Sequence, residues 1–249
     1  MKNKLPLIAP ILLALLFTPP MAQAQAPGAA FCASDGQPRP LQLLERFVNA
    51  DCQSCWQDPA TPSARPGQLV LDWVLAGQLG EDAPQAPVAS QEALERLTAL
   101  GLPVPAGASA KLQTIKGVRG LSGATLRVAH GLPLSGYVGA SIALRPVPAA
   151  AKTQRWTAWL ALVETLPVGT EGSPVERNLL RNVFHNTFQP NRDERRQLLK
   201  TEHTGFLETR SMSVAPAVNP ERLRVIGWVQ DGKGRLVAAA QSRCAPAAP

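Results

Sequence analysis

A Cys-x-x-Cys motif, Cys52-Gln53-Ser54-Cys55, follows a segment with the composition of a β-strand, residues 41–48. Only the short sequence Asn49-Ala50-Asp51 separates the two. A dithiol that follows a strand and opens a helix is typical of redox sites, because the helix N-terminus favours the thiolate form of the first cysteine. The motif therefore predicts a catalytic pair in which Cys52 attacks and Cys55 resolves the mixed disulfide.

The N-terminus has the pattern of a secretory signal peptide. Lys2 and Lys4 precede an apolar run, residues 5–16, and Ala22-Gln23-Ala24 offers a cleavage site. The alternative is an uncleaved anchor, but the run is short for a membrane span of about 20 residues and is broken by proline. We expect cleavage after Ala24, with Ala26 as the alternative, no membrane span after cleavage, and a periplasmic or secreted location.

Export places all four cysteines in an oxidising compartment, where disulfides persist. Four cysteines allow three pairings. We favour Cys52–Cys55, which are close in sequence, together with a structural disulfide between Cys32 and Cys244. The alternative is that Cys32 and Cys244 are free or pair between molecules.

Metal binding is not expected from the spacing of the candidate ligands. The chain has no second Cys-x-x-Cys pair, and its three histidines show no zinc-ligand spacing. A copper site made by the Cys52 and Cys55 thiolates with a distant histidine is the remaining alternative. We expect no metal and no other cofactor.

The stretch from Glu45 to Cys55 resembles the opening of an uncharacterised family of secreted bacterial thioredoxin-like proteins, which reads roughly E-x-F-x-x-x-x-C-x-x-C. Glu45, Phe47, Cys52 and Cys55 fall on that pattern. Weaker similarity covers residues 176–183 and the hairpin-like segments 223–230 and 236–240. The resemblance implies an N-terminal thioredoxin-like domain, a redox-active dithiol and a C-terminal β-sandwich.

The rest of the chain changes from helical to strand periodicity. Residues 90–101 form the clearest helix, with Ser90 as its N-cap and Gly101 as its end. Residues 102–123, rich in Gly, Pro and Ala, are expected to connect two domains. Apolar alternation then predicts an antiparallel sandwich. Strands are expected at 69–75, 125–129, 137–146, 156–166, 211–218, 222–230 and 235–241.

Residues 173–188 fit two structures. Ser173-Pro174-Val175-Glu176 has the pattern of a helix start with proline at its first position. The resemblance instead implies a strand over residues 183–188, which we prefer. His185 would then lie on a sheet surface.

Together these patterns predict an α+β fold with an N-terminal thioredoxin-like α/β domain and an antiparallel β-sandwich domain. The expected boundaries are 1–24 for the signal peptide, 25–39 for a lead-in, 40–110 for the thioredoxin-like domain and 120–245 for the sandwich.

Two acidic residues stand in strand-like segments beside the dithiol motif. A buried carboxylate can accept a proton during thiol exchange, so Glu45 is predicted to be catalytic together with Cys52 and Cys55. Asp72, inside the apolar segment 69–75, is a second candidate proton relay. For each of them, a purely structural polar group is the alternative.

The charge of the chain does not indicate nucleic-acid binding. The formal charge of +7 falls to +5 when Lys2 and Lys4 leave with the signal peptide, and the densest arginine cluster is interleaved with Asp193 and Glu194. The expected partner is instead a protein thiol or disulfide in the cell envelope. The sequence leaves the oligomeric state open.

Two functions fit these observations. The first is an exported thioredoxin-like protein that performs thiol-disulfide exchange through Cys52 and Cys55. The second is a non-catalytic binding or scaffold protein of the same fold, with a structural Cys52–Cys55 disulfide. Three prolines between Trp56 and Gly67 favour the second, because they limit any helix after Cys55 to about one turn.

Overall fold

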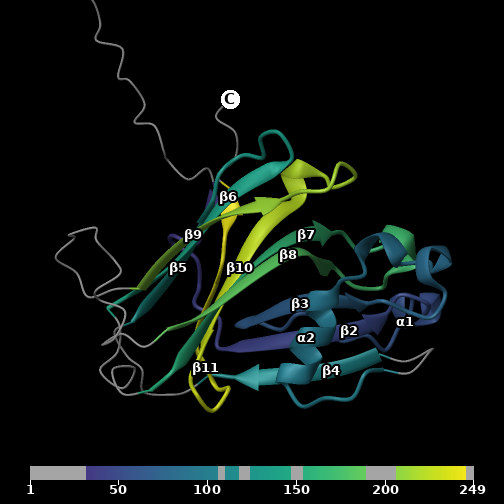
Figure 1. The fold of residues 1–249 in the computed structure, drawn as a ribbon, viewed down its shortest axis with the longest axis horizontal. Coiled ribbons are helices and arrows are strands. Elements are labelled where there is room, and N and C mark those ends of the chain that lie inside the picture. Colours follow the sequence, from purple (N-terminus) through teal and green to yellow (C-terminus); the bar gives the residue numbers. More distant parts are fainter. Residues whose placement is uncertain (1–31, 106–109, 118–123, 147–153, 189–205, 245–249) are drawn as a thin grey trace, which may run out of the picture.

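Two β-sheets packed face to face form the molecule, as seen in a computed structural model (Figure 1). The structure describes residues 32–105, 110–117, 124–146, 154–188 and 206–244. The expected signal peptide, its cleavage site and the arginine cluster at 192–196 lie outside the described residues. None of the helices in this described part is long and apolar enough to cross a membrane.

The larger sheet has seven strands in the order β11-β10-β7-β8-β3-β2-β4, and the smaller has five in the order β12-β1-β5-β6-β9. The strands of the larger sheet are β2 (Gln42–Asn49), β3 (Gln68–Leu75), β4 (Ala110–Lys116), β7 (Trp156–Leu166), β8 (Arg177–Phe188), β10 (Leu223–Gln230) and β11 (Leu236–Gln241). Those of the smaller sheet are β1 (Cys32–Ala33), β5 (Thr125–His130), β6 (Tyr137–Arg145), β9 (Phe206–Ser213) and β12 (Arg243–Cys244).

The larger sheet is mixed. β2 runs parallel to β3, and β3 runs parallel to β8, whereas β4, β7, β10 and β11 are each antiparallel to a neighbour. Two α-helices lie beside the parallel part: α1 (Gln53–Trp56) follows β2, and α2 (Gln91–Ala99) follows β3. Figure 1 shows α2 across the sheet near β2 and β3, and α1 beyond the end of β2. Short 3-10 turns complete the connections: η1 (Gly80–Asp82), η2 (Ala86–Val88), η4 (Thr170–Gly172) and η5 (Pro220–Arg222).

Each face of the larger sheet has its own apolar core, because strand side chains alternate between faces. Between the two sheets, Val128 and Ile142 of the smaller sheet pack with Trp156, Leu160 and Val225 of the larger one. On the opposite face, α2 packs through Ala93 and Leu97 on a second set of apolar residues. That set includes Phe47, Trp73, Trp159 and Trp228.

The expected α+β class with a thioredoxin-like N-terminal domain is wrong. The structure is mostly strand, and β2, β3 and β4 belong to the same sheet as β7, β8, β10 and β11. A helix covers the β2–β3 pair on one face only. On the other face α1 ends after Trp56, and the proline-containing segment that follows lies against β2, where Arg46 donates to the Pro62 carbonyl. Proline cannot continue a helix, so a second covering helix does not form there. A β-rich, sandwich-like fold is confirmed, but it is not the separate antiparallel domain that was expected, because the larger sheet is mixed and includes the N-terminal strands.

Individual helices and strands were predicted more accurately than the pairing of strands in the sheets. The Ser90 side chain caps α2 by accepting from the Ala93 amide, and Gly101 follows the helix with positive φ. A strand covers residues 177–188; it includes the preferred strand 183–188 and extends it toward the N-terminus, in place of the alternative helix. β9 lies five residues earlier than the expected strand 211–218. The expected connecting region 102–123 contains β4, an edge strand that is mostly exposed.

Close approach of the two sheets makes Gly227 a position that tolerates no side chain. A Cβ added there would overlap Val128 Cγ1 and lie 3.0 Å from Ile142 Cδ1, while one added at Gly139 would meet nothing within 4 Å. Gly227→Ala is therefore expected to lower the free energy of unfolding by about 1–3 kcal/mol through overpacking. Gly139→Ala is the matched control, and urea unfolding of the two variants measures the difference. Equal stabilities would contradict the observed distance between the sheets.

Candidate functional site

The dithiol lies at the end of β2, in the oxidised form. Cys52 and Cys55 form a disulfide with a Cα–Cα distance of 5.3 Å. Cys52 is buried, with 2% of its surface exposed, whereas Cys55 is partly exposed. An incoming thiol therefore has better access to Cys55 than to Cys52.

Two donors surround the Cys52 sulfur. The Cys55 backbone amide donates to Cys52 Sγ at 3.1 Å, and the Ser54 hydroxyl lies 3.5 Å from the same atom. Both groups belong to the single turn of α1, whose N-cap is Cys52. Hydrogen bonds to a sulfur stabilise its thiolate form, so this turn favours Cys52 as a leaving group.

Trp56 anchors the dithiol turn. Its side chain is fully buried, and its indole Nε1 donates to the Thr170 carbonyl at 3.2 Å. Arg177 lies over the indole ring, 4.5 Å from the ring centroid, and donates to the Trp56 carbonyl at 2.7 Å. Gln85 adds a further link, since its amide donates to Gln53 Oε1 of α1 at 3.4 Å and to Glu171 Oε2 at 3.0 Å. Contacts from β8 and from η4 thus fix the position of the dithiol turn.

Asp72 joins this anchor to the sheet. Its carboxylate accepts from Arg46 at 2.7 and 2.6 Å, from Arg177 at 3.1 Å and from the Asn178 amide at 2.9 Å. Burial lowers the pKa of Arg177, and the charge of Asp72 opposes that effect. With both oxygens engaged by fixed donors, Asp72 positions Arg177 against the dithiol turn, which differs from the predicted role of a proton relay.

Glu45 lies on the other face of the sheet, although it was predicted to be catalytic. It forms a bidentate ion pair with Arg96 of α2, at 2.8 Å for both contacts, and accepts from Trp73 Nε1 at 3.2 Å. Arg96 also lies 4.6 Å from the centroid of Trp159. None of these contacts involves Cys52 or Cys55. The alternation along β2 places Glu45 and Arg46 on opposite faces, so the structure brings Arg46 and Asp72, and not Glu45, toward the dithiol turn.

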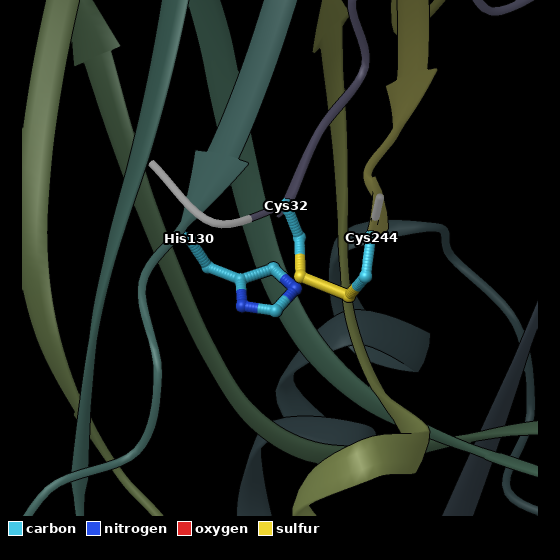
Figure 2. A group of neighbouring side chains, drawn as sticks. All are labelled: Cys32, His130 and Cys244. Carbon is cyan, nitrogen blue, oxygen red and sulfur yellow. A yellow bond between two sulfur atoms is a disulfide. The ribbon is translucent and has the colours of Figure 1, made fainter. Parts of the chain in front are cut away.

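A second sulfur-containing group lies where β1 is paired with both β5 and β12. Cys32 and Cys244 form a disulfide, the pairing favoured from the sequence, and they are direct partners in the β1–β12 ladder. Cys32 is also the ladder partner of His130 on β5. Figure 2 shows the imidazole beside the disulfide, and one ligand atom from each of the three residues lies within 4.8 Å of the others.

His130 is buried, with 3% of its surface exposed. Burial lowers the pKa of His130, the Gly131 carbonyl opposes that shift, and the positive charge of Arg224 reinforces it. The sequence does not indicate this group, because its three members lie far apart in the chain. Only the strand register brings them together, so no local spacing signals it.

Comparisons with known proteins add little to this geometry. No protein-family model matches the chain, and no curated protein matches it. Among solved structures, the chain is similar to HBP35 of Porphyromonas gingivalis, with 11% sequence identity and a TM-score of 0.44 over 85% of this chain and 78% of that one. A likeness this distant establishes neither a shared fold nor a function.

Proposed function

We propose that this chain is an exported protein that exchanges disulfides with protein thiols of the cell envelope through Cys52 and Cys55. The contrast between the two cysteines carries the proposal: residue Cys55 is partly exposed, while residue Cys52 is buried and its sulfur accepts from a backbone amide at 3.1 Å. The signal-peptide pattern of the first 24 residues supports the location, and the resemblance of the Glu45-to-Cys55 stretch to secreted bacterial proteins supports the activity.

The exchange proceeds by attack on the accessible sulfur. A partner thiolate attacks Cys55 Sγ, the Cys52–Cys55 bond breaks, and Cys52 leaves as a thiolate held by the Cys55 amide and the Ser54 hydroxyl. A second thiolate of the partner then attacks the partner's own sulfur in the mixed disulfide. The partner leaves as a disulfide, and the protein is left with two reduced sulfurs. This order reverses the roles expected from the sequence, where Cys52 was the attacking residue and Cys55 the resolving one.

A structural Cys52–Cys55 disulfide is the second candidate. The observation that favours it is the anchoring of Trp56, which Thr170 and Arg177 hold directly beside Cys55. In that case the disulfide would stabilise the turn, and the protein would bind a partner or act as a scaffold without catalysing thiol-disulfide exchange.

Single-cysteine variants test the proposed roles. Reduced Cys52→Ser leaves Cys55 free, reduced Cys55→Ser leaves Cys52 free, and each is mixed with a chromogenic aromatic disulfide while Cys32–Cys244 stays oxidised. We expect Cys55 to form the mixed disulfide faster than Cys52, because it is the more accessible sulfur. Faster reaction of Cys52 would restore the order expected from the sequence. If neither sulfur reacts until the chain is unfolded, the structural alternative is correct.

A further inference from the structure

We propose that Cys32, Cys244 and His130 form a site for one Cu(I) ion when the Cys32–Cys244 disulfide is reduced. The three residues contribute two sulfurs and one imidazole nitrogen within 4.8 Å of one another. Soft thiolate ligands bind Cu(I) and Zn(II), and imidazole is a ligand of both metals, so the number of ligands decides between them. Among the described residues this group offers three ligands, whereas a structural zinc site has four and a zinc site with three protein ligands keeps an open position for water. Cys32 and His130 are buried, which favours Cu(I), an ion that is stable with three ligands and no water.

The orientation of His130 gives the strongest support. Its Nδ1 lies 2.9 Å from the Gly131 carbonyl, which can only accept, so Nδ1 carries the proton and Nε2 keeps its lone pair. Nε2 is buried and has no hydrogen-bond partner. Buried polar atoms are rarely left unpaired. A ring held by a backbone carbonyl through one nitrogen, with the other nitrogen free, is the usual arrangement of a metal-binding histidine.

A nearby arginine side chain balances the charge of the proposed copper site. Two thiolates and one Cu(I) ion carry a net charge of −1. Arg224 donates to Cys244 Sγ at 3.5 Å, and its other hydrogen bonds go to the backbone carbonyls of Glu221 and Leu223. Its guanidinium charge is therefore placed to compensate a copper–dithiolate centre.

The binding sequence begins with reduction by a dithiol reductant. The reductant gives two electrons and two protons to the Cys32–Cys244 bond and leaves as its own disulfide. One Cu(I) ion then replaces the two thiol protons, which pass to solvent, and accepts the lone pair of His130 Nε2. A disulfide of the same reductant class reverses the step: it accepts two electrons and two protons, leaves as a dithiol, and the Cys32–Cys244 bond re-forms with release of Cu(I). The site therefore holds copper only in the reduced state.

The test uses the full mature chain with Cys52→Ser and Cys55→Ser, which leaves Cys32 and Cys244 as its only thiols. The reduced and oxidised forms are titrated anaerobically with Cu(I) against a chromogenic Cu(I) chelator. We expect one Cu(I) per reduced chain and none per oxidised chain. His130→Gln should weaken binding by at least about tenfold, the loss seen on removing even a supporting group at a metal site. His185→Gln is the matched control, because His185 is an exposed residue of β8. This variant should bind Cu(I) as tightly as the parent.

Two further measurements keep the proposal falsifiable if His130→Gln fails to fold. Near-ultraviolet circular dichroism of the reduced chain should keep its tertiary signal, and loss of that signal on reduction would overturn the proposal. X-ray absorption at the copper edge should show two sulfur ligands and one nitrogen ligand. Coordination by sulfur alone, absence of binding to the reduced chain, or unchanged affinity in His130→Gln would each overturn it.

Discussion

Asp72→Ala is expected to lower the free energy of unfolding by about 3–5 kcal/mol. The substitution leaves Arg46 and Arg177 buried without their shared counter-charge, with side chains only 1% exposed. Removing one partner of a buried ion pair is costly because the remaining charge is neither solvated nor paired. Urea unfolding followed by tryptophan fluorescence measures the loss.

Asp35→Ala provides the control for this experiment. Asp35 also forms a bidentate pair, with Arg127, but their side chains are 63% and 44% exposed. An exposed pair contributes about 0–1 kcal/mol, because water screens and solvates both charges. If the two variants lose the same stability, Asp72 does not act as the buried counter-charge described above.

The same substitution should also loosen the dithiol turn. Asp72 fixes Arg177, and Arg177 holds both the Trp56 carbonyl and the indole ring. Hydrogen–deuterium exchange in Asp72→Ala should therefore rise in residues 53–57, under conditions where the chain stays folded. Unchanged exchange there would show that the turn is held without Arg177.

Glu45→Gln is expected to destabilise the chain by a similar amount, about 3–5 kcal/mol, and to leave thiol exchange unchanged. Glu45 is fully buried and is the counter-charge of Arg96, so its neutralisation leaves the guanidinium unpaired beneath α2. Its contacts place it on the sheet face opposite Arg46 and Asp72. The rate of mixed-disulfide formation, measured over pH at a temperature where the variant is folded, separates the two roles.

Loss of a general acid or base costs about 10²–10⁴-fold in rate. A drop of that size in Glu45→Gln, with a changed pH profile, would restore the catalytic role predicted from the sequence. Glu92→Gln, at an exposed position in the first turn of the same helix, is the control. It should leave the rate unchanged and lower the free energy of unfolding by no more than about 0.3–1 kcal/mol, the contribution of a carboxylate near a helix N-terminus.

The parts of the fold that depend on neighbouring residues could be predicted from the sequence, whereas the pairing of strands could not. Residues 42–49 and 68–75 carry enough β-prone and apolar side chains to be recognised as strands, and Ser90 and Gly101 mark the ends of α2 through capping chemistry. The prolines after Trp56 correctly predict a helix of about one turn. Each of these inferences depends on neighbours in the sequence.

The pairing of strands depends on residues far apart, and here the sequence was misleading. The dithiol after a strand favoured a thioredoxin-like domain, but β3 pairs with β8 through Asp72 and Leu179, which joins the N-terminal strands to the C-terminal ones in one sheet. Likewise, nothing near Arg177 in the sequence indicates that it will reach both Asp72 and Trp56. The polar anchor of the dithiol turn is therefore visible only in the folded chain.

The reduction potential of the Cys52–Cys55 bond tests the proposed exchange most directly. The mature chain is equilibrated in graded glutathione buffers, free thiols are alkylated, and the modified peptides are identified by mass spectrometry, which separates Cys52–Cys55 from Cys32–Cys244. We expect a potential in the exchangeable range, about −120 to −230 mV. A potential below about −300 mV, or thiols that appear only on unfolding, would contradict it and identify Cys52–Cys55 as a structural disulfide.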